Sequence, residues 1–146
     1  MGNAGVTGGT CQLAGRLAKV TDSSGTVEYA YGKLGETVRE KRVLRQETGY
    51  VNMTREAVME YAGNYLGQME KITYPDGEEV SYGYDYGGNV TSVTGHNRGT
   101  NFTYVEKIGY DEYAQRVYIE YGSGVKSTYS YDPYRKLYRL SNIFNF

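Results

Sequence analysis

Hydrophobic and polar side chains alternate with a period of two in several segments of the chain. Val27, Tyr29 and Tyr31 fall on one side of an extended backbone, with a charged and a small residue between them, and 80–84 repeats this arrangement. Successive side chains of a strand point to opposite faces of a sheet. This period, carried by aromatic and β-branched residues, therefore predicts β-strands.

The predicted strands belong to a frame that recurs along the sequence. The frame is Tyr, any residue, Tyr-Asp, two residues, Gly, a polar residue and then two aliphatic residues three apart, and it is most complete in 82–93 and 129–140. Partial copies occupy 11–20, 29–38, 61–72 and 109–117. The glycine position falls on Gly15, Gly35, Gly67, Gly88, Ala114 and Arg135. These positions indicate six copies of a unit of about twenty residues, with an insertion around 39–58.

Each unit is expected to be a β-hairpin. An Asp carboxylate accepts a hydrogen bond from a backbone N–H two residues ahead, and a following Gly takes the left-handed conformation, so Tyr-Asp-x-x-Gly predicts a reversal. The segments 22–25 (DSSG), 75–77 (PDG) and 122–124 (GSG) supply the return turns. The predicted fold is all-β, an antiparallel meander of stacked hairpins that forms an open, curved sheet.

Two features of the pattern leave alternatives open. The aliphatic pairs after the glycine, such as Val90 and Val93, break strict alternation, so either a β-bulge returns both to one face or the strand uses both faces. Residues 55–62 are rich in helix formers, with Thr54 in position to cap a helix. The repeat register instead places 54–62 in a strand, which is the interpretation we prefer.

The composition agrees with the predicted strands and limits the classes of partner that we expect. The 146 residues include 20 Gly and 18 Tyr but only 3 Phe and no Trp, which suits a pleated surface interrupted by tight turns. Because the 16 basic and 17 acidic residues nearly cancel, the bulk charge indicates no nucleic-acid partner. The basic run 38–45 is interpreted as a solvated strand face or a charged sheet edge. No apolar stretch is long enough for a membrane helix, so membrane insertion is not expected.

The sequence shows no residue cluster typical of a catalytic, cofactor or metal site. The single Cys11 excludes an internal disulfide framework and is expected to be a small, partly buried residue, and the single His96 is expected in an exposed loop. Asp76, Glu78 and Glu79 lie in a predicted turn, without a recognisable second carboxylate or base beside them. We therefore predict no enzyme activity and no cofactor.

The frame resembles the YD repeat of the rearrangement-hotspot (Rhs) family, which also occurs in the C-component of bacterial ABC toxin complexes and in animal teneurins. The likeness covers 13–140, and 72–90 looks most like the bacterial members. It is best at Tyr84-Asp85 with Gly88, Tyr110-Asp111 with Gln115-Arg116-Val117, Tyr131-Asp132 with Leu137, and Gly15-Arg16-Leu17. The only Asp-Pro step, Asp132-Pro133, belongs to a repeat, so the Asp-Pro-x-Gly self-cleavage motif of the family is not carried over.

The resemblance implies a structural signature rather than a catalytic one. It divides the chain into a flexible Gly-rich arm at 1–10, a repeat sheet at 11–140 and a tail at 141–146. The signature residues are Gly15, Leu17, Tyr29, Tyr31, Gly35, Tyr61, Gly67, Tyr82, Tyr84, Asp85, Gly88, Tyr110, Asp111, Tyr129, Tyr131 and Asp132.

The resemblance also implies a function. In full-length members the sheet spirals into a hollow shell around a C-terminal effector, often a toxin, so this chain is expected to be an arc of such a β-shell that encapsulates or presents an effector. Its expected partners are copies of itself, through sheet edges or faces, or the rest of a larger Rhs-like protein. Its expected location is secreted or cell-surface. The alternative is a carbohydrate- or protein-binding module that uses rows of exposed Tyr on the sheet, with a glycan as one ligand.

Overall fold

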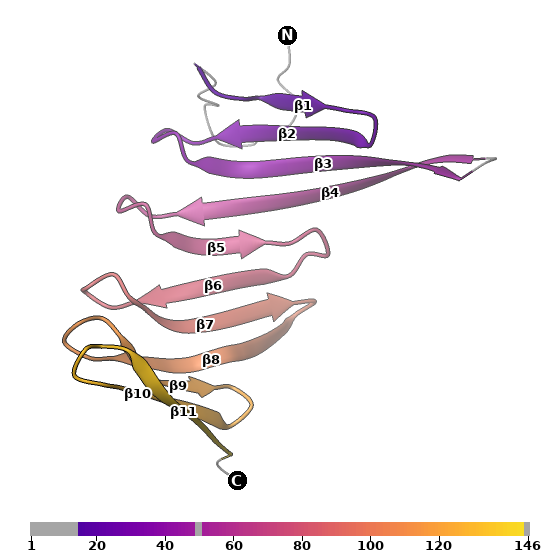
Figure 1. Cartoon of the computed structure of the whole chain (residues 1–146). Helices are drawn as coiled ribbons and strands as arrows, with labels where there is room; N and C mark the ends of the chain where they lie inside the picture. The colour runs from indigo at the N-terminus through magenta and orange to yellow at the C-terminus, as the bar shows by residue number, and fades with distance from the viewer. Residues whose placement is uncertain (1–14, 49–50, 145–146) are drawn as a thin grey trace. The chain divides into compact units, whose positions relative to one another are not determined.

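The protein is all-β, as the alternating pattern predicts. The computed structural model describes residues 15–48 and 51–144, which form eleven strands and no helix, each antiparallel to its paired neighbours (Figure 1). The predicted arm at 1–10 and Cys11 lie outside the described residues. The chain divides into two compact units with the boundary after Asp76.

The first unit is a meander of five consecutively paired strands. They are β1 (Lys19–Thr21), β2 (Gly25–Tyr31), β3 (Thr37–Thr48), β4 (Val51–Gly63) and β5 (Met69–Thr73). The insertion expected around 39–58 lengthens the β3–β4 hairpin, which extends beyond β2 and β5 (Figure 1). Residues 54–62 are strand, so the helix alternative is wrong: their pairing with β3 outweighs the local helix propensity.

The second unit contains six strands in the same consecutive order. They are β6 (Glu79–Tyr84), β7 (Val90–Asn97), β8 (Thr100–Tyr110), β9 (Arg116–Tyr121), β10 (Val125–Tyr131) and β11 (Leu137–Phe144). The predicted return turns at 75–77 and 122–124 fall between strands, and the turn at 22–25 does so up to Gly25, which is the first residue of β2.

Two local expectations in the second unit need correction. His96 is exposed as expected, but it lies in β7 and not in a loop, because it pairs with Glu79 and the chain reverses only at Arg98 and Gly99. The tail expected from residue 141 is strand as far as Phe144, because β10 pairs with β11 along its whole length.

A β-bulge occurs at the same place in all five hairpins that contain a Tyr-x-Tyr strand or its equivalent. In the β6–β7 pair, Tyr82 opposes Val93 and Tyr84 opposes Val90, so the register passes over Thr91. The other passed-over residues are Val38, Glu70, Val117 and Tyr138. Directly opposed residues share a face, so the bulge returns both aliphatic residues to the tyrosine side, and the bulge alternative is confirmed.

Each unit therefore has a tyrosine face, which carries the Tyr-x-Tyr residues and the side chains opposed to them, and a polar face. Few side chains are deeply buried: among the described residues the apolar ones are Val80 and Ile119, at 7% and 5% exposure, and the polar one is Ser127. All three lie in the second unit, on its tyrosine face. Because each unit is a single sheet layer, many of its large apolar side chains remain exposed.

Candidate functional site: the repeat loops and tyrosines

The loops after β4, β6, β8 and β10 are each closed by the side chain at the Asp position of the frame. Asp111 Oδ1 accepts hydrogen bonds from the backbone N–H groups of Tyr113 and Gln115, each at 2.9 Å. Asp132 accepts equivalent bonds from Tyr134 and Lys136. In the first unit Asn64 takes this role, with its Oδ1 3.0 Å from the backbone N of Leu66 and of Gln68. The side chain thus satisfies donors that a tight loop would otherwise leave to solvent.

All six glycine-equivalent positions have a left-handed backbone. Their φ angles are 70° at Gly15, 86° at Gly35, 78° at Gly67, 84° at Gly88, 58° at Ala114 and 64° at Arg135. Residues other than glycine seldom adopt this conformation, so the repeat geometry persists at Ala114 and Arg135 even where the sequence lacks glycine.

Two loops depart from the Asp pattern in informative ways. Asp85 accepts a 2.8 Å bond from the backbone N–H of Asn89, and this bond, helped by the Asn89 side chain, lowers the pKa of the exposed carboxyl below its usual range. Gly32 occupies the Asp position of its loop, and the Glu36 carboxylate fills the space where a side chain at Gly32 would stand.

The second tyrosine of the frame connects neighbouring repeats. The hydroxyls of Tyr31, Tyr110 and Tyr131 donate to the backbone carbonyls of Leu17, Val90 and Arg116 at 2.8, 2.8 and 2.9 Å. Each acceptor lies two residues after the left-handed residue of the preceding repeat. We call this contact the tyrosine clasp.

Side chains of adjacent loops also contact one another. The residue after the left-handed position donates to the carbonyl of the left-handed residue in the next repeat: Arg16 to Gly35 at 2.5 Å, and Gln115 to Arg135 at 3.0 Å. The Arg135 guanidinium lies 3.6 Å from the centre of the Tyr113 ring. The loops of consecutive repeats therefore contact one another at the ends of the strands.

The signature tyrosines are half-buried and used within the sheet. Those of β2, β4, β6, β8 and β10 are Tyr29, Tyr31, Tyr61, Tyr82, Tyr84, Tyr110, Tyr129 and Tyr131. Burial raises the pKa of Tyr61, Tyr110 and Tyr129 above the ordinary phenol value. The remaining signature residues lie in the loops or, for Gly15 and Leu17, just before β1.

Four other tyrosines with exposed side chains lie at the loop tips. They are Tyr65, Tyr86, Tyr113 and Tyr134. They occupy the two variable positions between Asp and Gly, which the sequence frame treats as unspecified. The signal that identifies them is that four of these loops carry a tyrosine at one of those positions.

The carboxylates considered for catalysis have structural contacts. The Tyr104 hydroxyl donates to Glu78 Oε1, and Glu79 is opposed to His96 across the β6–β7 pair. Within 15–48 and 51–144, no group of three or more His, Cys, Asp or Glu residues is placed to hold a metal ion. The same residues contain no helix that is long and apolar enough to cross a membrane.

Comparison with known proteins shows which repeat these loops and tyrosines resemble. The RHS Repeat family model matches residues 64–100. This segment is similar to the RHS repeat. The resemblance inferred from the Tyr-Asp frame is thereby confirmed, and the loops at 64–67 and 85–88 lie within the matched RHS repeat. The search of curated proteins found no match.

Several solved structures are similar to this chain in fold. A crystal structure of TcdB2–TccC3 without its hypervariable C-terminal region has a TM-score of 0.80 and 19% identity over 89% of this chain. A crystal structure of TcdB2–TccC3 gives 0.75 and 18% over 83%, and a Tc holotoxin pore from Photorhabdus luminescens gives 0.73 and 19% over 83%. The matched part is 7%, 7% and 6% of those chains, so this chain spans a small fraction of their length.

Proposed function

We propose that this chain is a structural segment of an Rhs-like wall that encloses or presents an effector and has no catalytic activity of its own. The observation that carries the proposal is the use of the signature residues. The Asp side chains close loops, the second tyrosines clasp the preceding repeat, and first tyrosines such as Tyr129 lie opposite an aliphatic residue of the paired strand. Side chains with these contacts stabilise the sheet, and few of their polar groups remain to act on a substrate.

The sparse core supports the same function. Only two apolar side chains among the described residues are buried, which is few for a chain long enough to form a compact domain. The tyrosine face is half-covered, and it becomes a core only when other protein lies against it. The wall is thus completed by the rest of a larger Rhs-like protein or by copies of this chain, in a secreted or cell-surface assembly.

The test uses the complete reading frame that contains these residues. The purified product is treated with a nonspecific protease, and the surviving segments are identified by mass spectrometry. A wall predicts that the repeat sheet and any segment that it encloses survive together. A variant with Val80→Asp and Ile119→Asp should lose this protection. If the unchanged protein and the variant are cleaved equally along their whole length, the proposal is contradicted.

The second candidate is a binding module for a glycan or a protein, and the loop-tip tyrosines favour it. Tyr86 and Tyr134 are exposed aromatic rings, whereas the sheet tyrosines first considered for this role are half-buried. Titration of a glycan panel with tyrosine fluorescence as the readout tests this candidate. A saturable change that is lost in Tyr86→Ala and Tyr134→Ala, but kept in Leu34→Ala, would support binding at the loop tips.

A further inference from the structure

The long β3–β4 hairpin leaves a strand edge open within the first unit. β2 pairs with β3 only as far as Leu44, and β5 pairs with β4 only from Glu60 onward, so residues 51–59 of β4 pair with β3 alone among the described residues (Figure 1). We call residues 51–59 the arm edge; nine extended residues span about 30 Å. The strands on both sides of the hairpin belong to the chain and stop short of it, so the insertion creates this edge.

One face of the arm edge carries a cation between apolar side chains. The register with β2 and β3 places Met53, Arg55 and Ala57 on the tyrosine face. Met53 is 49% exposed, and Leu44, which is opposed to Arg55, is 48% exposed. Arg55 is also exposed. A strand added at this edge would therefore meet apolar groups with a guanidinium between them.

Arg55 differs from the neighbouring cations of the hairpin. Lys41 forms an ion pair with Glu56, and Arg42 forms one with Glu40. The Arg55 side chain has no hydrogen bond or ion pair with another side chain that the structure describes. Its guanidinium is therefore available to a carboxylate from outside the chain, and guanidinium–carboxylate pairs are among the stronger polar contacts of proteins.

A second copy of the arm edge is a poor partner for the first. Antiparallel pairing of two copies over all nine residues is centred on Arg55 and opposes it to its own copy. A shift of the centre by one residue opposes Glu56 to Glu56, or else opposes Arg55 to Met53. Like charges directly opposite one another destabilise a strand pair. None of these registers gives Arg55 a carboxylate.

We propose that the arm edge binds an extended peptide segment of another protein, in which an acidic residue faces Arg55 and the apolar residues two positions to either side face Met53 and Ala57. Backbone hydrogen bonds of the added strand give affinity, and its alternate side chains give specificity. This interaction goes beyond the proposed wall function, because neither the loops nor the tyrosine clasps use the arm edge.

The test uses the full chain and two fluorescent peptides, VTVTETVTV and VTVTKTVTV. On one face, valines flank a central glutamate or lysine at two-residue spacing, and threonines occupy the other face. Fluorescence anisotropy at physiological ionic strength should show saturable binding of the glutamate peptide. The lysine peptide should bind about threefold to tenfold more weakly, because its charge directly opposes Arg55.

A charge reversal in the protein locates the site. Arg55→Glu should reverse the preference, so that the lysine peptide binds more tightly than the glutamate peptide. Arg45→Glu is the matched control, because Arg45 is exposed on the opposite face of the same hairpin, and it should keep the original preference. Circular dichroism and a thermal melt establish that each variant keeps its fold.

Three outcomes overturn the inference. They are no saturable binding of the glutamate peptide, equal affinity for the two peptides, and a preference that Arg55→Glu does not change. A dimer of the unchanged chain that the glutamate peptide dissociates, observed by light scattering, would assign the edge to a second copy and also overturn it. Arg55→Glu should leave the protease protection of the complete reading frame unchanged, so a failure of peptide binding leaves the wall function standing.

Discussion

The two units close the same loop by different means. In the second unit Asp85, Asp111 and Asp132 keep the carboxylate that caps the loop, yet Ala114 and Arg135 replace glycine at the left-handed position. In the first unit both left-handed residues of the complete hairpins, at 35 and 67, are glycine, while Gly32 and Asn64 replace Asp. Each loop keeps at least one of two devices, the Asp carboxylate that caps the loop or the glycine at the left-handed position.

This difference shows that glycine and the carboxylate cap partly substitute for one another. A non-glycine residue in the left-handed region costs roughly 1–2 kcal/mol. Each net hydrogen bond contributes about 0.5–1.5 kcal/mol, and Asp111 accepts two from its loop. The two effects are comparable, so a loop with a full cap tolerates Ala114, and a loop with glycine tolerates Gly32.

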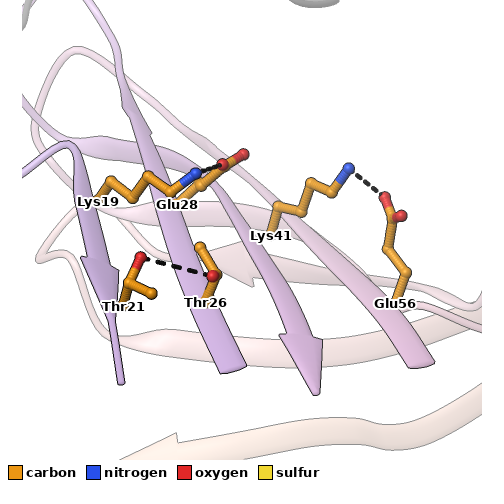
Figure 2. A network of polar contacts seen from close by, with 6 residues as sticks. All are labelled: Lys19, Thr21, Thr26, Glu28, Lys41 and Glu56. Carbon is orange, nitrogen blue, oxygen red and sulfur yellow. Dashed lines mark hydrogen bonds and ion pairs between the residues drawn. The ribbon is translucent and has the colours of Figure 1, made fainter. Parts of the chain in front are cut away.

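The faces of the units differ as well. The first unit carries cross-strand ion pairs, Lys19 with Glu28 and Lys41 with Glu56, beside the Thr21–Thr26 hydroxyl contact (Figure 2). The second unit holds all of the deeply buried apolar residues found in the described chain. The second unit also has such a pair, Lys126 with Glu120, so the units differ more clearly in apolar burial than in surface ion pairs.

The largest expected effect tests this contrast in burial. Ile119→Ala should lower the free energy of unfolding by about 2–4 kcal/mol, because it removes buried methylene groups and leaves a cavity. Ile72→Ala, at a half-buried position of the first unit, should cost about 1 kcal/mol. Urea denaturation followed by tyrosine fluorescence measures both. Equal losses would show that the units do not differ in their cores.

The next effect tests the carboxylate cap. Asp111→Ala should cost about 1–2 kcal/mol, because two backbone N–H groups lose their acceptor and Ala114 stays left-handed without support. Asp111→Asn keeps an acceptor oxygen and is the control. Adding Ala114→Gly to Asp111→Ala should restore part of the loss in the same urea assay. If the double variant is no more stable than Asp111→Ala, the two devices are not exchangeable.

A smaller effect tests the glycine position alone. Ala114→Gly should stabilise the protein by about 0.5–1 kcal/mol, since relief of the left-handed strain exceeds the entropy that glycine adds to the unfolded chain. Gly67→Ala should destabilise it by about 1 kcal/mol through φ alone, because a Cβ there would meet no atom within 4 Å. Thermal melts of both variants would show shifts of opposite sign. Shifts of the same sign would contradict this account.

The smallest effect concerns the ion pairs of the first unit. Lys19 lowers the pKa of Glu28 below its ordinary value through a 2.8 Å hydrogen bond, but both side chains are largely exposed. Lys19→Gln should therefore cost at most about 0.5 kcal/mol, and nothing measurable in high salt. The contribution is present above the ordinary glutamate pKa and is lost as the pH falls through the lowered one. An NMR titration should show the Glu28 pKa rising in Lys19→Gln; an unchanged pKa would contradict the assignment.

Much of the fold was predictable because its signals are local. The period of two identifies strands, and the spacing of left-handed positions counts the repeats even where Ala114 or Arg135 hides the glycine. The bulge was predictable as one of two alternatives, since the aliphatic pair Val90 and Val93 had to share a face or divide between two. The position of His96 within β7 was not, because strand ends depend on the length of the partner strand.

The loop-tip tyrosines show a second reason why the sequence did not predict every feature of the site. Tyr86 and Tyr134 occupy variable positions of the frame, and only the folded loop shows them as exposed. The tyrosine clasp was hidden for a similar reason, because a bond from Tyr131 to the Arg116 carbonyl depends on how two repeats stack. Such contacts join residues of different repeats, and the pattern within one repeat does not contain them.

The sequence by itself determined that this protein is a chain of tyrosine-rich hairpins with an Asp-or-Gly loop, because turn chemistry and side-chain alternation act over a few residues. The tertiary structure decided how those hairpins are joined: which carbonyl receives each tyrosine hydroxyl, which aliphatic residues become core, and which edge stays open. Burial and clasp contacts arise only when neighbouring strands are in register. Ile119 and Leu140 therefore occupy the same place in the repeat and end with opposite exposure.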